Sequence, residues 1–189
     1  MQTYIIYKPY GMLSQFTREV DTHLTLKDLD YDFAPDVYPV GRLDSDSEGL
    51  LLLTNDKSLN QKLLSPKSKS PKVYHIQVEG IPSDEALQQI RDGVTIRIKG
   101  KSIATQPCQI KRVDNLPKFP DRVPPIRVRK AIPTTWLAIT LTEGKNRQVR
   151  RMLATINHPV LRLIRTQFAG YQLGKSPLIA LKSGDIISL

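Results

Sequence analysis

Apolar residues recur at every second position in some segments of the chain and at every third or fourth in others. In Lys72–Glu79, Tyr74, Ile76 and Val78 share one face, which predicts a β-strand with one buried face. The segment LLLLT at 50–54 predicts a buried strand that ends in a polar turn. Further strands are expected at 3–8, within 94–113, and at 136–142, 160–168 and 178–181.

Helical spacing is clearest over residues 146–156. The apolar stripe there comprises Val149, Met152, Leu153 and Ile156. Ser83 is a suitable N-cap for a second helix, which ends before Gly93, and shorter helices are expected at 25–29 and 58–64. Because strands and helices do not alternate strictly, the pattern predicts an α+β fold with a mixed sheet flanked by helices.

Two segments follow neither pattern. Residues 66–71 form a polar connection bounded by prolines, and residues 115–135 contain five prolines and five Lys or Arg. We expect the second segment to be an irregular basic loop, and a loop of that length in a compact domain is usually functional or disordered. The length of 189 residues suits one domain, 1–189, in which two lobes would meet near 65–72.

The net charge of +10 is concentrated in the later half of the chain. Residues 1–56 hold four Lys or Arg against ten Asp or Glu, whereas residues 111–165 hold thirteen against three. Clustered Arg in a domain with a pI of about 9.8 is typical of a protein that binds a polyanion, although solvated surface charge is the plainer alternative. The charge therefore predicts a nucleic-acid partner, bound more weakly as salt rises.

The remaining composition indicates a soluble, cytoplasmic protein without a membrane segment. Cys108 is the only cysteine, so no intrachain disulfide forms, and we expect it to be a small buried apolar group. The N-terminus has no signal-peptide pattern, and the longest aliphatic run, at 50–53, is far shorter than the ~20 residues of a membrane helix. No apolar stripe is left over for an interface, so we expect a monomer.

Asp44, Asp46 and Glu48 stand at a spacing of two in GRLDSDSEG. The spacing suggests a calcium loop, but such a loop needs a Glu at its twelfth position, where this chain has Asn55. A magnesium site for phosphoryl transfer stays open as an alternative, although no Gly-rich phosphate loop accompanies the acids. For Asp46 alone we favour a solvated side chain, whereas Arg42 is expected to hold Asp44 ionised and to fix its direction.

The stretch GRLDSDSEGLLLLTND resembles the catalytic motif of the ribosomal-RNA pseudouridine synthases of the RsuA type. The similarity continues in the family's order, across essentially the whole chain, in YIIYKPYGMLSQF, KVYHIQVEG, LTEGKNRQVRRML and LRLIR. PPIRVRKAIPTTWLAITLTEG is most similar to members that act on large-subunit ribosomal RNA. Many members have an additional N-terminal RNA-binding module of the S4 type. This chain begins at the catalytic domain, so we expect target recognition from elsewhere, in part from residues 115–135.

The resemblance implies a pseudouridine synthase domain with a mostly antiparallel sheet and a central cleft. It implies an isomerase that converts a specific uridine of ribosomal RNA into pseudouridine. The reaction breaks the bond between ribose C1′ and uracil N1 and rejoins the base through C5, so no cofactor and no metal are expected. Asp44 matches the family's catalytic aspartate, either as the nucleophile at C1′ or as the base that removes a ribose proton. Both roles require the ionised form.

Tyr74 and Arg150 complete the catalytic set that the resemblance implies. Tyr74 would stack on the uracil and accept or relay the C5 proton, although its strand face also suits a core tyrosine. Arg150 would pair with the catalytic aspartate, and it borders the apolar stripe of its predicted helix. Val149 would line the pocket. RNA contacts are expected from Arg147 and Arg151, for which ordinary surface charge is the alternative. Arg42 would contact RNA or help to displace the target base.

A uridine stacked in a stem cannot reach Asp44, so the target nucleotide is expected to flip out of the stack. Two other classes of function remain open. One is a non-catalytic RNA-binding or ribosome-assembly protein of the same fold. The other is a metal-dependent nuclease or phosphatase that uses Asp44, Asp46 and Glu48. Unchanged modification of ribosomal RNA after Asp44→Asn would favour the non-catalytic protein. Loss of activity with a chelator would favour the metal-dependent enzyme.

Overall fold

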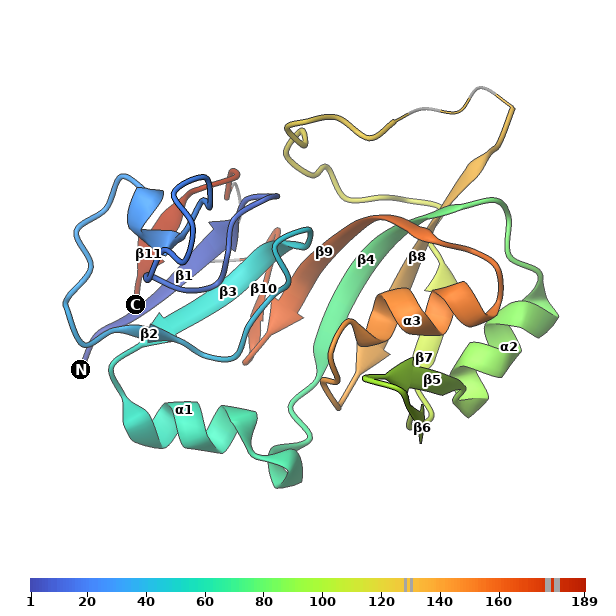
Figure 1. Ribbon diagram of the computed structural model, residues 1–189, viewed down its shortest axis with the longest axis horizontal. Helices are drawn as coiled ribbons and strands as arrows, with labels where there is room; N and C mark the ends of the chain where they lie inside the picture. The colour runs from blue at the N-terminus through green and yellow to red at the C-terminus, as the bar shows by residue number, and fades with distance from the viewer. Residues whose placement is uncertain (128, 130, 176–177, 179–180) are drawn as a thin grey trace.

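One nine-stranded sheet runs through the computed structural model, which describes residues 1–127, 129, 131–175, 178 and 181–189 (Figure 1). The strand order is β11-β1-β3-β9-β4-β8-β7, with β2 paired to β3 and β10 paired to β9. The strands of this sheet are β1 (Thr3–Lys8), β2 (Tyr38–Pro39), β3 (Glu48–Thr54), β4 (Lys72–Glu79), β7 (Gln109–Arg112), β8 (Thr134–Leu141), β9 (Val160–Phe168), β10 (Tyr171–Gln172) and β11 (Ile186–Ser188). A separate hairpin consists of β5 (Thr95–Ile98) and β6 (Lys101–Ala104).

The sheet is mixed and mainly antiparallel, as predicted. Among the described residues β3 and β9 form the one parallel pair of strands, at the join between the two halves of the sheet. In that pair Gly49 lies opposite Arg165. Gly49 has a φ of +100°, and a Cβ atom there would collide with the Arg165 backbone. The close approach of the two strands therefore requires glycine.

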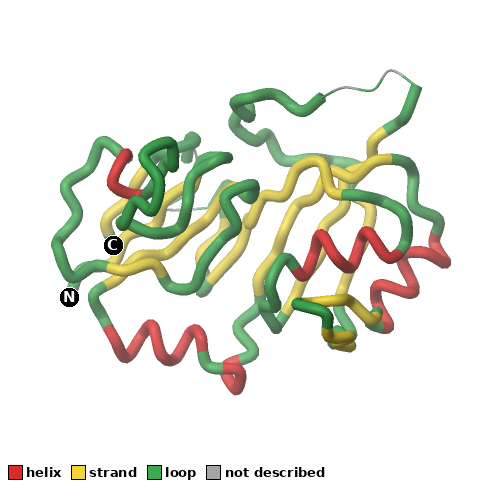
Figure 2. Tube along the Cα trace, in the orientation of Figure 1, coloured by secondary structure: helices red, strands yellow, loops and turns green. Residues whose placement is uncertain are grey.

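In the described part of the chain, three α-helices flank the sheet (Figures 1 and 2). These are α1 (Lys57–Leu64), α2 (Asp84–Asp92) and α3 (Gln148–Thr155), and short 3₁₀ helices span Leu26–Asp28 and Pro66–Ser68. Helix α2 begins where the sequence predicted, because the Ser83 side chain accepts a hydrogen bond from the Ala86 N–H. Helices α2 and α3 lie over one face of the β4–β8 half, next to the β5–β6 hairpin (Figure 1).

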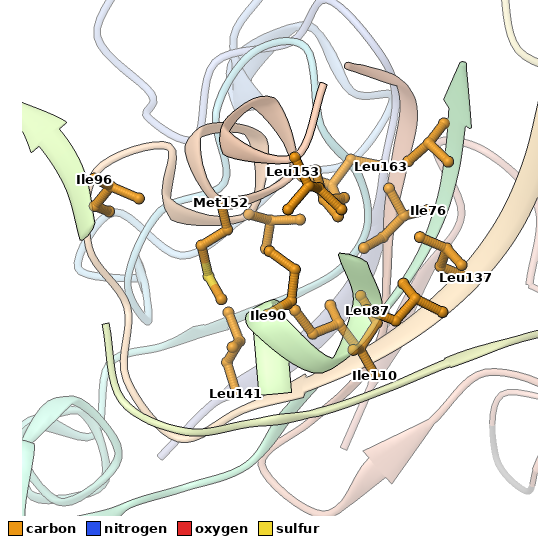
Figure 3. Close-up of a cluster of buried hydrophobic side chains, with 14 residues drawn as sticks. Ile76, Leu87, Ile90, Ile96, Ile110, Leu137, Leu141, Met152, Leu153 and Leu163 are labelled. Atoms are coloured by element: carbon orange, nitrogen blue, oxygen red, sulfur yellow. The ribbon is translucent and has the colours of Figure 1, made fainter. Parts of the chain in front are cut away.

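The two halves of the sheet have separate apolar cores. In the β4–β8–β9 half, side chains of α2, α3 and the strands form one buried cluster (Figure 3). In the β1–β3 half, alternate residues of the strands feed two clusters, one on each face. Tyr74 packs against the cluster of the first half and against one cluster of the second, so this strand face lies where the halves meet.

The basic segment 115–135 packs its first part on the sheet. The Phe119 ring lies 5.3 Å from the His75 ring and 5.8 Å from the Trp136 ring, measured between centroids. The Pro120 carbonyl accepts a hydrogen bond from Arg162 at 2.7 Å, and the Arg122 guanidinium lies over the Tyr10 ring at 4.2 Å. The loop is therefore irregular, as expected, but its first part is bound to both halves of the molecule.

Most predicted elements coincide with the observed ones, and β1, β4 and β9 have the predicted bounds. Helix α3 starts later than residue 146, because Arg147 adopts a left-handed conformation with a φ of 49°. The strand expected at 178–181 lies largely outside the described residues, and the sequence did not reveal β2, β10 and β11. Among the residues that the structure describes, no helix combines the length and apolar character needed to cross a membrane.

Candidate active site

A cavity of about 830 Å³ lies between the two halves of the molecule. Its lining comes from the loop before β3, the connection between α1 and β4, the start of α3, and strands β4 and β9. Of the residues predicted from the sequence, this lining includes Arg42, Asp44, Tyr74, Arg147 and Val149. Segments that are far apart in the sequence thus bring five of the seven candidate residues to one cavity.

Asp44 belongs to a loop whose backbone is held on several sides. The Ser14 hydroxyl donates to the Leu43 carbonyl at 2.8 Å and accepts from the Leu43 N–H at 3.0 Å. The Gly11 N–H donates to the Ser45 carbonyl at 2.7 Å. The Asp44 side chain is 32% exposed, so its carboxylate is accessible from the cavity although its backbone is fixed.

Lys8 anchors the same loop through its side chain. Its role in the site was not predicted from the sequence. Its side chain is fully buried, and Nζ donates to the carbonyls of Pro9 at 2.8 Å, Met12 at 2.7 Å and Ser45 at 3.3 Å. Burial lowers the pKa of Lys8 to about 7, against the opposing effect of nearby carboxylates. The YIIYKPYGM segment carried the resemblance, but no pattern in it indicated a buried lysine.

Asp46 is ion-paired and not freely solvated, which corrects the expectation for this residue. Arg147 donates to its two carboxylate oxygens at 3.1 and 2.7 Å. Arg150 places Nε 3.3 Å from the same carboxylate and donates from Nη2 to the Asp46 carbonyl at 2.6 Å. Burial alone would raise the pKa of Asp46, but the Arg147 hydrogen bonds and the Arg150 charge outweigh it, so this pKa is lowered.

The guanidinium beside Asp44 belongs to Arg147, at 3.8 Å, and the two expected partners lie elsewhere. Arg150 pairs with Asp46 and also donates to the Val160 carbonyl at 3.3 Å. Arg42 is exposed at the cavity lining, and within the described part of the chain it has no ion pair with Asp44. Among the described residues, Arg147 is thus the arginine within ion-pair distance of Asp44, and Arg150 is ion-paired with Asp46.

Val149 and Arg151 occupy different surroundings. Val149 is 5% exposed and lines the cavity. Arg151 donates to the Asn146 carbonyl at 3.2 Å and to the Arg97 carbonyl of β5 at 2.5 Å. Its guanidinium is thus held against the β5–β6 hairpin, outside the cavity lining.

Glu48 forms a buried ion pair within the fold and does not line the cavity. Arg162 donates to its two carboxylate oxygens at 2.8 and 2.7 Å, and the side chains are 3% and 10% exposed. With Glu48 bound to one guanidinium and Asp46 to two, these acids do not offer the free oxygens that a divalent cation needs. Among the described residues, no cluster of three or more His, Cys, Asp or Glu could hold a metal ion.

Tyr74 and Arg165 are opposite each other on β4 and β9 and line the cavity together. Tyr74 is half-buried, and Arg165 is 3% exposed. Arg165 was not singled out from the sequence, although LRLIR belonged to the resemblance. Its position in the strand sequence VLRLIRTQF gave no sign that it borders a site.

Cys108 is half-buried beneath α2, and its thiol donates to the Ile90 carbonyl at 3.3 Å. Burial raises the pKa of this thiol to about 11, so it is protonated at neutral pH and a poor nucleophile. Its surroundings suit the packing role expected from the sequence.

Residues 2–155 match the family model described as RNA pseudouridylate synthase. The chain therefore belongs to the RNA pseudouridine synthase family, a class of RNA-modifying enzymes. Two relatives bear the name ribosomal large subunit pseudouridine synthase E. The one from Vibrio vulnificus is 51% identical, with 96% of this chain and 72% of the relative covered. The one from Xanthomonas axonopodis pv. citri is 46% identical, with 89% and 86% covered. The narrower resemblance inferred from the sequence is confirmed.

Solved structures agree with this assignment of the fold. A crystal structure of a pseudouridylate synthase superposes with a TM-score of 0.76 at 25% identity, over 100% of this chain and 70% of the other. A structure of an H/ACA ribonucleoprotein bound to a substrate RNA gives a TM-score of 0.56 at 15% identity, over 90% and 48%. The second similarity extends to the fold alone.

Proposed function

We propose that this protein converts a uridine of large-subunit ribosomal RNA into pseudouridine, with Asp44 as the reacting carboxylate. The observation that carries the proposal is the position of Asp44 and Tyr74 in the lining of one cavity, with a guanidinium 3.8 Å from the Asp44 carboxylate. The names of relatives that are 46% and 51% identical support ribosomal RNA as the substrate.

Asp44 would act at the ribose. The carboxylate either attacks C1′ or removes a proton from the sugar, and both reactions need it ionised. Arg147 lies 3.8 Å from Asp44 but leaves it free of the two-pronged hydrogen bonding that engages Asp46. A reactive carboxylate needs such freedom, since an oxygen held by a guanidinium is less available to a substrate.

Tyr74 would hold the base. Its ring projects from β4 into the cavity lining, where stacking on a uracil contributes ~1–3 kcal/mol. The phenol is then suitably placed to accept or relay the C5 proton. Val149, at the start of α3, would form part of the apolar wall.

Arg150 would be a positioning residue that acts through Asp46. Its contacts with the Asp46 side chain and carbonyl connect α3 to the loop that carries Asp44. Arg147 also contacts the Asp46 side chain, from the N-cap position just before the helix. The two arginines thus hold the loop against α3, and the direction of the Asp44 carboxylate follows from that contact.

RNA would bind across the opening of the cavity, with the target uridine flipped out of its stack. Arg42 is exposed there and also borders an adjacent groove lined by Phe16 and Tyr38. It would contact the phosphate backbone or occupy the space that the flipped base leaves. Arg151 and the segment 115–135 would add phosphate contacts at the edge of the site.

The decisive experiment replaces Asp44 by Asn and measures pseudouridine in ribosomal RNA incubated with the purified protein. We expect the wild type to modify one or a few uridines and Asp44→Asn to form no detectable pseudouridine, with RNA affinity within a few-fold of the wild type. Asp114→Asn is a matched control at an exposed acid and should be as active as the wild type. Equal modification by Asp44→Asn would contradict the proposed role of Asp44.

A further inference from the structure

Arg165 is a buried cation in the wall of the cavity with part of its guanidinium unused. Its Nε donates to the Leu50 carbonyl at 2.8 Å, and its guanidinium carbon lies 4.3 Å from the centre of the Phe168 ring. Nη2 is buried and has no hydrogen-bond partner among the described residues. A buried donor without a partner is destabilising by about 1–3 kcal/mol, and more for a charged group.

The charge of Arg165 also lacks a nearby acid in the described part of the chain. Burial lowers the pKa of its guanidinium, and the Tyr74 phenol beside it is the group that opposes this effect. Its charge acts on two other cations: the pKa of Lys72 is lowered by burial and by Arg165, and Arg165 also contributes to the lowered pKa of Lys8. By contrast Arg162, three residues earlier on β9, is neutralised by Glu48. The fold therefore compensates one buried arginine of this strand and leaves the other uncompensated.

The proposed reaction generates an anion where this cation lies. When the C1′–N1 bond breaks, its electron pair leaves with the base, and the negative charge spreads from N1 to the carbonyl oxygens of uracil. The base then turns, C5 forms the new bond to C1′, the C5 proton is lost and N1 gains a proton. Atoms and electrons balance without a further reactant. The uracil anion is formed whether Asp44 attacks C1′ or removes a sugar proton.

We propose that Arg165 is a catalytic residue that donates a hydrogen bond to a carbonyl oxygen of the uracil and stabilises the departing base as an anion. This inference rests on the proposed function, because it assigns a group to a step of that reaction. Two contacts fix the guanidinium before substrate binds: the Leu50 carbonyl and the Phe168 ring. A fixed donor in a site shielded from water stabilises developing charge more strongly than water does.

The test compares uridine with 5-fluorouridine as the target nucleotide in single-turnover reactions. Fluorine withdraws electrons and makes uracil a better leaving group, so the reaction depends less on a cation. Because fluorine also blocks loss of the C5 proton, the readout is consumption of the target nucleoside, measured by mass spectrometry after digestion of the RNA. We expect Arg165→Met to slow the reaction of uridine roughly 100-fold, and that of 5-fluorouridine roughly 10-fold or less. Arg165→Lys, which keeps the charge, should fall between Arg165→Met and the wild type.

The control for structural damage is the double variant Glu48→Gln, Arg162→Met. It removes a buried ion pair from the same strand without altering the cavity lining. It should lower the melting temperature and slow both nucleotides by the same factor. If Arg165→Met slows the reactions of uridine and 5-fluorouridine by the same factor, or slows neither reaction, the inference about Arg165 is wrong. If the wild type forms no pseudouridine in any ribosomal RNA, the proposed function fails instead.

Discussion

Asp44 and Asp46 belong to one loop but have different electrostatic surroundings. Asp46 accepts hydrogen bonds from Arg147 on both carboxylate oxygens and is also paired with Arg150. Asp44 has one guanidinium at 3.8 Å. Two neighbouring acids with different partners can take different tasks. Asp46 connects the loop to α3, and in the proposed reaction Asp44 would act on the substrate.

Lys8 gives the same loop a dependence on pH. Its Nζ donates to three backbone carbonyls, one of them at Ser45 next to Asp44. A protonated amine has three hydrogens for these carbonyls, whereas a neutral amine has two. Loss of the proton therefore removes one anchor of the loop.

We expect the stability of the wild type to rise with pH relative to a Lys8→Met variant between about pH 7 and pH 10. Burial lowers the pKa of folded Lys8 from 10.5 to about 7, so in this window the unfolded state binds more protons than the folded state. The slope from this group is at most ~1.4 kcal/mol per pH unit. Urea unfolding at several pH values measures the difference between the two proteins. If the plots of unfolding free energy against pH are parallel for the two proteins, the pKa of Lys8 is not lowered.

At the scale of secondary structure, the parallel contact between β3 and β9 joins the two halves of the sheet. Gly49 makes this contact possible, since its φ of +100° and its closeness to the Arg165 backbone exclude a side chain. The same pair carries the loop of Asp44 on one strand and Arg165 on the other. The geometry of the cavity therefore depends on this join.

We expect Gly49→Ala to lower the free energy of unfolding by roughly 2–4 kcal/mol, because the methyl group forces the two strands apart and the backbone conformation is strained. Gly100→Ala is the matched control. Gly100 has a φ of +79° in the turn between β5 and β6, and a methyl group there would meet no atom within 4 Å. Gly100→Ala should lower the free energy of unfolding by about 1 kcal/mol, from strain alone. Urea unfolding of both variants separates the steric collision from the strain of the backbone conformation. Equal losses of unfolding free energy in the two variants would contradict the steric collision at position 49.

The elements that the sequence predicted carry local signals, and those it missed do not. Strand β4 shows period-two alternation, and α2 has a capping serine and a terminal glycine. Strand β11 spans three residues and exists because it pairs with β1, which lies at the other end of the chain. The bidentate pair of Asp46 with Arg147 likewise joins residues about 100 positions apart. Patterns of neighbouring residues do not specify such contacts.

At the scale of the whole molecule, charge and shape have to act together on a folded RNA. The acidic first third of the chain supplies the Asp44 loop, and the basic later half supplies β9, α3 and the segment 115–135. This segment contacts Tyr10 through Arg122, so it spans both halves of the molecule. Under the proposed function, an RNA placed over the cavity would meet cations from several elements, and the Asp44 carboxylate would face its ribose.

Arg42 offers the sharpest test of this arrangement. It is exposed at the cavity and unpaired with Asp44, so its guanidinium is available to a phosphate group. We expect Arg42→Gln to weaken binding of a ribosomal RNA fragment, and to reduce the slope of log affinity against log salt by about 1. Arg112→Gln is the control. Arg112 is ion-paired with Asp84 at 2.7 Å, so this variant should leave the slope unchanged. Fluorescence anisotropy at several salt concentrations measures both slopes. If Arg42→Gln binds more weakly but keeps the wild-type slope, Arg42 contacts a base or the vacated stack and not the phosphate backbone, because only an ionic contact releases counterions.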